Sequence, residues 1–349
     1  MTGSPSYQSY LPLASIGVRM RVGNNDDVSL ASRQLLELII REIRAGGPMT
    51  FARYMEIALY HPQFGYYRRG DRFGMKGDFY TAEQLQPVFG ELLSSFVDKL
   101  TQESDVPSVP ILELGAGRGE VGQNLGSRGY QSFDWHTRQL PAKWEGMVFA
   151  NEFFDALPVH LLVKQEQWHE LFVVEEEPGT LKLQARAASD VRLGSYADRF
   201  GTDLPNGGRF EACLAAADWM EIIARLLRTG WLLVIDYGYD AHELARLPEG
   251  TLLSYRSHRA EAVMLGDAGD QDITAHVNFS WLTDVAEAND FVRVTNMSLA
   301  RWAMSIWDEE VFSEKWAHAD ERWRLQWKQL VFGLGETFRV LMFRKVAAK

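Results

Sequence analysis

The stretch Val109-Pro-Ile-Leu-Glu-Leu-Gly-Ala-Gly-Arg-Gly119 decides the fold. Its first six residues form a short, mostly apolar run, which predicts a buried β-strand. Residues 120–127, which follow the glycines, predict a helix. Glycines between a strand and a helix let the backbone turn tightly and let a ligand approach without meeting a Cβ atom. This order predicts a Rossmann-like α/β core with a ligand seated on the glycine loop.

The glycine loop favours a ligand that carries no phosphate. The dinucleotide fingerprint G-x-G-x-x-G needs a third glycine at position 120, where this chain has Glu120. A glutamate at the start of a helix also competes with a pyrophosphate for the positive end of the helix dipole. A nucleotide-dependent oxidoreductase is therefore disfavoured. S-adenosylmethionine has no phosphate, and we predict that Gly115, Gly117 and Gly119 hold it.

Two acidic residues near the loop are predicted to complete the cofactor site. Glu113 ends the first strand, where it can steer the sulfonium or the amino group of the cofactor. Asp134 lies 21 positions later, about where a ribose-binding acid ends the second strand. Only 31 residues separate Gly119 from Asn151, and one βαβ unit takes about 30. We expect one edge strand and its helix to be missing, so that Asp134 ends strand two or strand three.

Periodicity places further elements around this core. Strands are predicted at residues 130–134, 146–150, 231–236 and 337–343, with an antiparallel meander at 159–164, 168–174 and 180–185. Helices are predicted at 29–45, 50–60 (with Thr50 as N-cap), 83–100, 211–228 (ended by a Gly230 cap) and, rich in tryptophan, 299–330. We divide the chain into a disordered or flexible tail (1–28), an N-terminal helical and lid region (29–105) and a core (106–349) with insertions at about 159–210 and 255–330.

Composition excludes several classes of protein. Apolar residues make up 46% and charged residues 24% of the 349 residues, which is typical of a globular protein. The net charge of −11 repels phosphate backbones, so we expect no nucleic acid partner. One cysteine, Cys213, and eight histidines without metal spacing predict no metal site. The longest relevant apolar run, 231–235, is far too short to span a membrane. We expect a cytoplasmic protein.

The motif Asn151-Glu-Phe-Phe-Asp-Ala-Leu-Pro158 resembles the MidA-type methyltransferases, whose mitochondrial members are complex I assembly factors. Similar motifs occur at residues 47–55, 58–62, 64–67, 77–81, 89–91, 233–238, 250–252, 272–277 and 333–336. The resemblance implies a class I methyltransferase fold and methyl transfer from S-adenosylmethionine. It implies a protein arginine acceptor, as in the mitochondrial members, and a place in the mitochondrial matrix if the source is eukaryotic. It also implies a cofactor contact for Asp78.

The sequence departs from that family after the glycine loop. Family members carry a Val-Glu-x-x-Pro strand whose acid binds ribose, and this chain has no such motif. Trp135-His136 instead resembles the Trp-His that precedes the NEFFDALP strand. In that alignment the ribose acid of the family is lost, and Asp134 is either a stand-in for it or a bystander.

Acidic and polar residues near strand ends are the candidates for catalysis. An arginine acceptor is always cationic, so carboxylates must neutralise and orient it. Glu152 and Asp155 follow a strand end and are our predicted acceptor pair, with helix capping as the alternative role. Asn151, at the same strand end, is predicted to contact the cofactor. His276 follows Asp272 by four residues and would share a helical face with it, as a general base or as a hydrogen-bonded partner.

Three functions remain open at this point. The first is a methyltransferase that acts on a protein side chain. The second is a catalytically weak or inactive methyltransferase fold that serves as an assembly or binding protein, suggested by the missing segment. The third is a methyltransferase for a small-molecule acceptor. The turn 236–238, at another strand end, is a further candidate for the acceptor pocket, and a homodimer is a further hypothesis.

Overall fold

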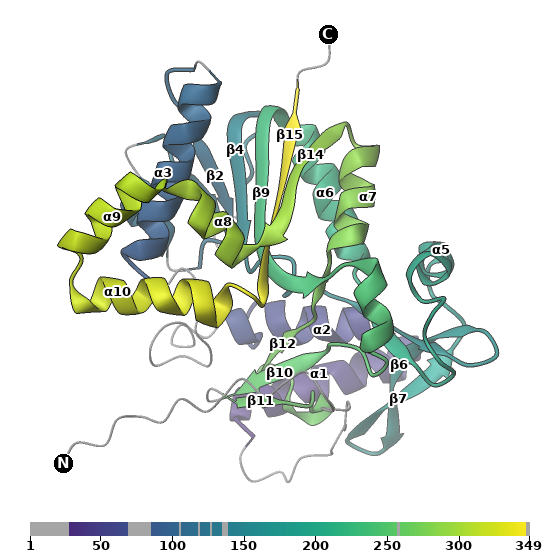
Figure 1. The fold of residues 1–349 in the computed structure, drawn as a ribbon. Helices are drawn as coiled ribbons and strands as arrows, with labels where there is room; N and C mark the ends of the chain where they lie inside the picture. Colours follow the sequence, from purple (N-terminus) through teal and green to yellow (C-terminus); the bar gives the residue numbers. More distant parts are fainter. Residues whose placement is uncertain are drawn as a thin grey trace.

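The structure is a computed structural model that describes residues 28–68, 85–104, 106–117, 119–125, 128–134, 139–256 and 259–346. A central sheet flanked by helices forms one lobe, and a second lobe lies beneath it in Figure 1. Asp78, part of the predicted lid region (residues 69–84), the start of the predicted helix 83–100 and residues 1–27 of the predicted tail lie outside the described residues. The predicted division into domains stays a proposal.

The central sheet has the strand order β14-β15-β9-β4-β2-β3, and β13 pairs with β9 off this path. Strands β2 (Ile111–Leu114), β3 (Gln131–Phe133), β4 (Trp144–Asn151), β9 (Leu227–Tyr239) and β13 (Val277–Asn278) run parallel to one another. Strand β15 (Phe338–Lys345) is antiparallel to both β9 and β14 (Phe291–Ser298). The Rossmann-like α/β fold predicted from the glycine loop is therefore confirmed.

The short stretch after the glycine loop has the expected effect on the sheet. Within the described residues, only β3 lies outside β2, so the sheet lacks a further edge strand there. Phe133 pairs with Leu114 at the end of both strands, and Asp134 follows directly. Asp134 therefore ends strand two, the position of a ribose-binding acid.

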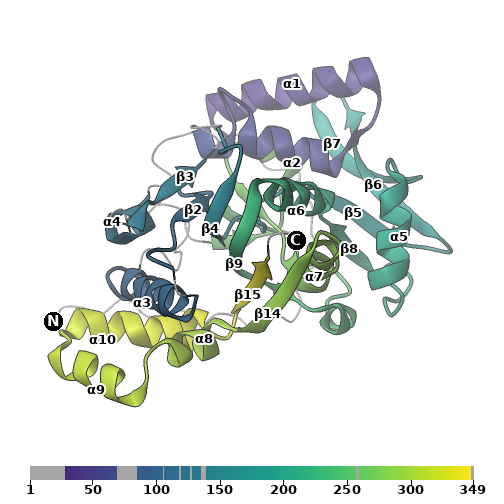
Figure 2. The same cartoon turned by 90° about the horizontal axis from the view of Figure 1, so that it is seen from above.

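Helices cover both faces of the sheet, because residues of β4 alternate between two hydrophobic clusters. Met147 and Phe149 pack with α3 (Val88–Glu103) and α4 (Glu120–Leu125). Val148 and Ala150 pack with α6 (Leu214–Leu226) and α7 (Phe279–Ala288). Figure 2 shows the two groups of helices on opposite sides of the strands. The glycine loop, at the end of β2, thus sits on a rigid scaffold that is covered on both faces.

The tryptophan-rich segment is three helices and not the single helix predicted over 299–330. They are α8 (Leu299–Ile306), α9 (Glu309–His318) and α10 (Glu321–Lys328), followed by a π-helical turn, Gln329–Leu334. Asp308 and Asp320 start α9 and α10, since their carboxylates accept the N–H groups of Val311 and Trp323 at 2.9 and 2.7 Å. Neighbouring tryptophan rings pack within the core.

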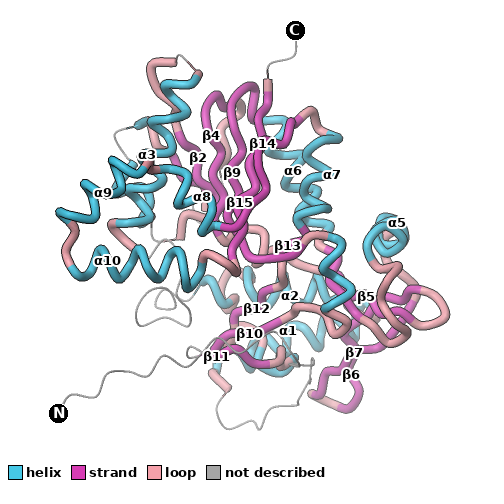
Figure 3. Tube along the Cα trace, in the orientation of Figure 1, coloured by secondary structure: helices cyan, strands magenta, loops and turns pink. Residues whose placement is uncertain are grey.

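The second lobe combines two helices with two small sheets (Figure 3). Helices α1 (Leu30–Gly46) and α2 (Phe51–Tyr60) begin at the N-caps Ser29 and Thr50. One sheet contains β1 (Met49–Thr50), β8 (Arg209–Ala212) and the predicted meander of β5 (His160–Lys164), β6 (Trp168–Glu177) and β7 (Thr180–Arg186). The other contains β10 (Leu253–Arg256), β11 (Arg259–Glu261) and β12 (Asp272–Thr274). The lobe also holds α5 (Val191–Phe200) and the 3₁₀ turns Tyr66–Arg68, Ala241–Arg246 and Leu265–Asp267.

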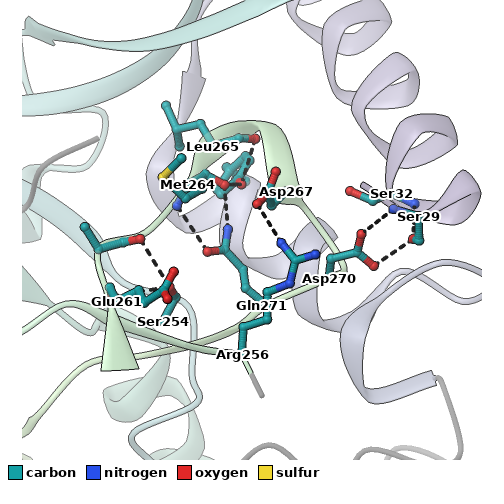
Figure 4. A network of polar contacts seen from close by, with 12 residues as sticks. Ser29, Ser32, Ser254, Arg256, Glu261, Met264, Leu265, Asp267, Asp270 and Gln271 are labelled. Carbon is teal, nitrogen blue, oxygen red and sulfur yellow. Dashed lines mark hydrogen bonds and ion pairs between the residues drawn. The ribbon is translucent and has the colours of Figure 1, made fainter. Parts of the chain in front are cut away.

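A polar network joins α1 to the segment between β11 and β12 (Figure 4). The backbone N–H and the hydroxyl of Ser29 donate to the carboxylate of Asp270 at 2.8 and 2.7 Å. The same hydroxyl accepts the N–H of Ser32 at 3.1 Å and so caps the helix. Nearby, Arg256 donates to Asp267 at 3.2 Å. These contacts fix α1 against the small sheet.

Gly230 is not the helix cap that the sequence suggested. Helix α6 ends at Leu226, and Gly230 lies inside β9, paired with Gly146 of β4. Its φ is +132°, and a Cβ atom there would lie 1.8 Å from the carbonyl oxygen of Gly146. The two strands can approach this closely only because residue 230 is glycine, whereas a Cβ atom on Gly146 would meet the carbonyl oxygen of Pro110, at 2.3 Å.

We expect Gly230→Ala to lower the free energy of unfolding by about 3 kcal/mol or more, through steric overlap and backbone strain together. Urea denaturation measures the effect. Gly179→Ala is the matched control, because Gly179 has a φ of +87° and a Cβ atom added there would meet nothing within 4 Å. It should cost about 1 kcal/mol from strain alone. Equal losses in the two variants would contradict the close approach of β4 and β9.

Candidate functional site

The glycine loop needs glycine for two different reasons. Gly115, Gly117 and Gly119 have φ values of +74°, +52° and +72°, which side-chain-bearing residues rarely adopt. A Cβ atom on Gly115 would lie 2.9 Å from the ring of Phe153, so that position is also crowded by protein. Among the described residues, a Cβ atom on Gly117 would meet only the carbonyl oxygen of Gly115, at 4.0 Å. No described residue fills the space beside Gly117, which fits a ligand that approaches the backbone closely.

Contacts from β3 hold the loop and its acid in place. The N–H of Gly115 donates to the carbonyl of Phe133 at 2.8 Å, which brings the loop beside the end of β3 and therefore beside Asp134. Glu113 is 1% exposed, and its carboxylate accepts a hydrogen bond from the hydroxyl of Tyr130. Tyr130 could not be predicted from the sequence, because its pairing with Glu113 depends on how β3 aligns with β2. The predicted cofactor residues of β2 and β3 lie together.

The end of β4 carries a strained turn. Glu152 has a φ of +48°, one of two positive values among the non-glycine residues that the structure describes. Its N–H donates to the carbonyl of Ile235 at 2.9 Å, which fixes the turn to β9. Asn151 is 4% exposed, and its Oδ1 atom is buried without a hydrogen-bond partner in the described part of the chain. Strained backbone and an unsatisfied polar atom are typical of a ligand site.

Asp155 does not cap a helix, because the chain passes from β4 to β5 without one, and Asp236 supports the connecting segment. The carboxylate of Asp236 accepts the N–H groups of Phe154 and Asp155 at 3.0 and 3.3 Å, and that of Tyr237 at 2.9 Å. The side chain of Asp155 is left to accept a hydrogen bond from the Tyr237 hydroxyl through Oδ2. Its Oδ1 atom is buried without a partner among the described residues, although Asp155 is only 5% exposed.

Burial shifts the ionisation of both aspartates upward. Loss of hydration raises the pKa of Asp155 to about 6, against the opposing effect of the Tyr237 hydroxyl. The pKa of Asp236 is raised well above its usual range by burial and by the nearby charges of Asp155 and Glu152. The site therefore favours a cation, which would stabilise the ionised carboxylates.

His276 reaches the site by a different route from the one the sequence suggested. Asp272 lies in strand β12, so the two residues do not share a helical face and that expectation is wrong. The ring of His276 instead packs edge-on against Tyr237, with centroids 5.3 Å apart. Burial lowers the pKa of His276 to about 4, so the ring is neutral at pH 7. Asp272 accepts a hydrogen bond from the Tyr67 hydroxyl at 2.9 Å.

The described residues contain neither a candidate metal site nor a candidate membrane-spanning helix. Within those ranges, no group of three or more His, Cys, Asp or Glu side chains is arranged to hold a metal ion. No helix there combines the length and apolarity needed to cross a membrane. The thiol of Cys213 is partly buried and donates to the carbonyl of Pro158 at 3.7 Å, so it is a packed residue.

Comparison with known proteins agrees with this geometry. Residues 122–297, just over half of the chain, match the model of a family of S-adenosyl-L-methionine-dependent methyltransferases. A Burkholderia thailandensis protein crystallised with S-adenosyl-homocysteine superposes with a TM-score of 0.80 and 27% identity, covering 93% of this chain and 95% of that one. A native structure of a protein from the same organism gives a TM-score of 0.77 with 27% identity and the same coverage.

Among curated proteins, the chain is similar to the mitochondrial protein arginine methyltransferase NDUFAF7. The mouse protein is 28% identical over 324 residues, which cover 76% of this chain and 72% of the relative. The human protein is 28% identical over 313 residues, which cover 72% and 69%. These findings confirm the resemblance to the MidA-type proteins. The chain belongs to this family of methyltransferases, and it is an enzyme whose cofactor is S-adenosylmethionine.

Proposed function

We propose that this methyltransferase acts on an arginine side chain of a protein. The observation that carries the proposal is the buried carboxylate of Asp155, which has one oxygen without a partner among the described residues. Such a group calls for a cationic hydrogen-bond donor, and arginine is the side chain that keeps its positive charge even when buried, whereas burial readily lowers the pKa of lysine. The names of the NDUFAF7 relatives, which specify protein arginine, support the same acceptor.

We assign the cofactor to the end of the sheet that carries the glycine loop. Gly115, Gly117 and Gly119 would receive its amino-acid end, and Glu113 would face the charged groups of that end. Asp134 would hold the ribose hydroxyls, and Asn151 would donate to or accept from the cofactor at the end of β4. Asp78, outside the described residues, keeps its place as a proposed contact. When bound, S-adenosylmethionine supplies a methyl group on a positively charged sulfur.

The residues of the chain supply position, charge and a proton acceptor. The acceptor nitrogen must be held in line with the methyl group and away from water. We assign this role to Glu152 and Asp155, whose carboxylates would neutralise the guanidinium. The nitrogen gives up one proton as it gains the methyl group. Asp155, with a pKa of about 6, is a better acceptor for that proton than His276, with a pKa of about 4; His276 would shape the site through Tyr237.

Peptide methylation tests the proposed acceptor. The full chain is incubated with methyl-labelled S-adenosylmethionine and an arginine-rich peptide, and with the same peptide carrying lysine in place of arginine. We expect label only on the first peptide, and mass spectrometry should place the methyl group on the guanidinium. Label on the lysine peptide alone, or on neither peptide while a small-molecule amine is methylated, would reject a protein arginine acceptor.

Two further proposals concern the localisation and the oligomeric state of the protein. The curated relatives are mitochondrial by name; for this chain we propose the cytoplasm, or the mitochondrial matrix in a eukaryotic source. The homodimer also stays a prediction. Light scattering of the purified chain would decide it.

A further inference from the structure

We propose that six residues form a binding site for the planar cation of the methyl acceptor, with aromatic rings around two buried carboxylates. This cation site is made of Tyr60, Tyr67, Asp155, Tyr237, Asp272 and His276. The inference rests on the proposed function and extends it, because it names the side chains that recognise the acceptor and the chemical class that they select.

The first half of the cation site is built on the end of β9. The hydroxyl of Tyr237 donates to Oδ2 of Asp155, so the carboxylate is held beside the Tyr237 ring. The ring of His276 packs edge-on against the same tyrosine at 76°. Both rings are partly exposed, whereas Asp155 is buried. An aromatic surface therefore lies next to a carboxylate whose position is fixed.

The second half comes from the other lobe. The hydroxyl of Tyr60 donates to the carbonyl of Ala156 at 2.9 Å, directly after Asp155. The rings of Tyr60 and Tyr67 lie 5.4 Å apart, and the Tyr67 hydroxyl donates to Asp272. These rings are also partly exposed. The backbone N–H of Ala275, the residue before His276, donates to the carbonyl of Asp155 at 3.0 Å and ties the two halves together.

Within the cluster, the carboxylate of Asp155 has no cationic partner in the described part of the chain. No ion pair joins Asp155 to a described lysine or arginine, and its Oδ1 atom has no hydrogen-bond partner in the described ranges. A buried carboxylate that lacks a partner is costly, and the cost is recovered when a donor binds. The carboxylate of Asp155 is therefore suited to a ligand that donates hydrogen bonds and carries a positive charge.

The rings narrow the class of cation. Tyrosine faces attract cations, and a flat guanidinium also stacks on them while its N–H groups reach a carboxylate in the same plane. A compact ammonium group gains less from such stacking. The cation site therefore favours a guanidinium group over an ammonium group, and it rejects a neutral group of the same shape.

Small probes test this selection without any turnover. Methylguanidinium is titrated into the full chain saturated with S-adenosylhomocysteine, so that the cofactor site is occupied and cannot bind the probe. Binding is followed by calorimetry or ligand-observed NMR. N-methylurea is the neutral probe of matched shape, and butylammonium is the probe with a compact charge. We expect saturable millimolar binding of methylguanidinium, and affinities at least about tenfold lower for the other two. Equal affinity for N-methylurea, or tighter binding of butylammonium, would overturn the proposal.

Variants locate the probe. Asp155→Asn should lower the methylguanidinium affinity at least about tenfold, whereas Asp267→Asn, in the network of Figure 4, should leave it unchanged. Tyr237→Phe keeps the ring and should lower affinity about threefold. Its matched control is Tyr54→Phe, which removes a buried hydroxyl that donates to Leu265 at 3.0 Å. Unchanged affinity in Asp155→Asn, with S-adenosylhomocysteine still bound, would refute the cation site.

The outcome is separable from that of the proposed function. If arginine peptides are methylated but Asp155→Asn does not change the affinity for methylguanidinium, the proposed function stands and the acceptor binds elsewhere. Methylguanidinium that binds at Asp155 while arginine peptides stay unmodified would reject the proposed function alone.

Discussion

The Gly117→Val substitution is expected to lower the affinity for S-adenosylhomocysteine by about 100-fold or more, which corresponds to ~3 kcal/mol. The φ of Gly117 is +52°, and a Cβ atom there points into space that no described residue fills. A valine side chain would fill the volume that a cofactor needs in order to reach the backbone of the loop. Isothermal titration calorimetry with S-adenosylhomocysteine measures the loss.

The control variant must introduce the same backbone strain without filling the proposed cofactor site. Gly207→Val does so, because Gly207 has a φ of +85° in a turn of the second lobe, and a Cβ atom added there would meet nothing within 4 Å. Both variants should lose stability by about 1–3 kcal/mol, but only Gly117→Val should lose the cofactor. Full affinity in Gly117→Val would mean that the cofactor does not approach this loop.

The cofactor side of the site could be predicted from sequence because it is local. Gly115, Gly117 and Gly119 follow their strand directly, and only a short segment separates them from Asp134. Strand-loop-helix order and chain length therefore determined both the glycine conformations and the place of Asp134 at the end of strand two. The missing edge strand was predictable for the same reason, since too few residues remained to build it.

The acceptor side could not be predicted because its contacts are distant in sequence. Tyr237 lies 82 residues from Asp155, and Tyr67 lies 205 residues from Asp272. Their hydrogen bonds depend on the register of β9 against β4 and on how the second lobe packs. Periodicity reports which face of an element is buried, but it carries no information on which elements meet. His276 shows the result, because its residue type suggested a site but its partner was assigned wrongly.

The prediction of helix ends in the tryptophan-rich segment was wrong for a local reason. The apolar pattern continues through residues 299–330, so it predicts one helix. Asp308 and Asp320 each cap a new helix within that pattern. An aspartate inside an amphipathic stretch serves equally as a surface residue or as an N-cap, and the pattern alone does not distinguish them.

The Asp155→Asn substitution is expected to lower kcat/KM for an arginine peptide by about 100-fold at pH 8, the size of effect found when one member of a buried charge pair is removed. In the unsubstituted enzyme, activity should rise with pH through about 6, because burial places the pKa of Asp155 there and only the ionised carboxylate neutralises the guanidinium. The variant should lack this rise. Its residual activity should be flat in the same range.

The same substitution should increase stability at pH 8, by about 1–3 kcal/mol. The pKa of Asp155 is higher in the fold than in the unfolded chain, so folding is favoured by the protonated form. That contribution is present below about pH 4 and is lost as the pH rises through about 6. Asparagine keeps a hydrogen-bond acceptor for Tyr237 but has no charge to desolvate. The gain should therefore be small at pH 4 and complete above pH 7.

Urea denaturation of both proteins at pH 4, 6 and 8 measures this difference, and Asp284→Asn, at an exposed ion pair with Arg199, is the control. Comparing the variant with its parent cancels the titration of distant groups, and the gain measured at pH 8 includes the relief of Asp236, whose pKa the charge of Asp155 raises. Tyr60, Tyr67 and Tyr237, which also interact with Asp155, stay protonated from pH 4 to 8 because burial raises their pKa values. A variant that is both inactive and less stable at pH 8 would show that Asp155 holds the fold together. A variant that is inactive and more stable identifies a carboxylate that the fold keeps at a cost in stability because the reaction requires its charge.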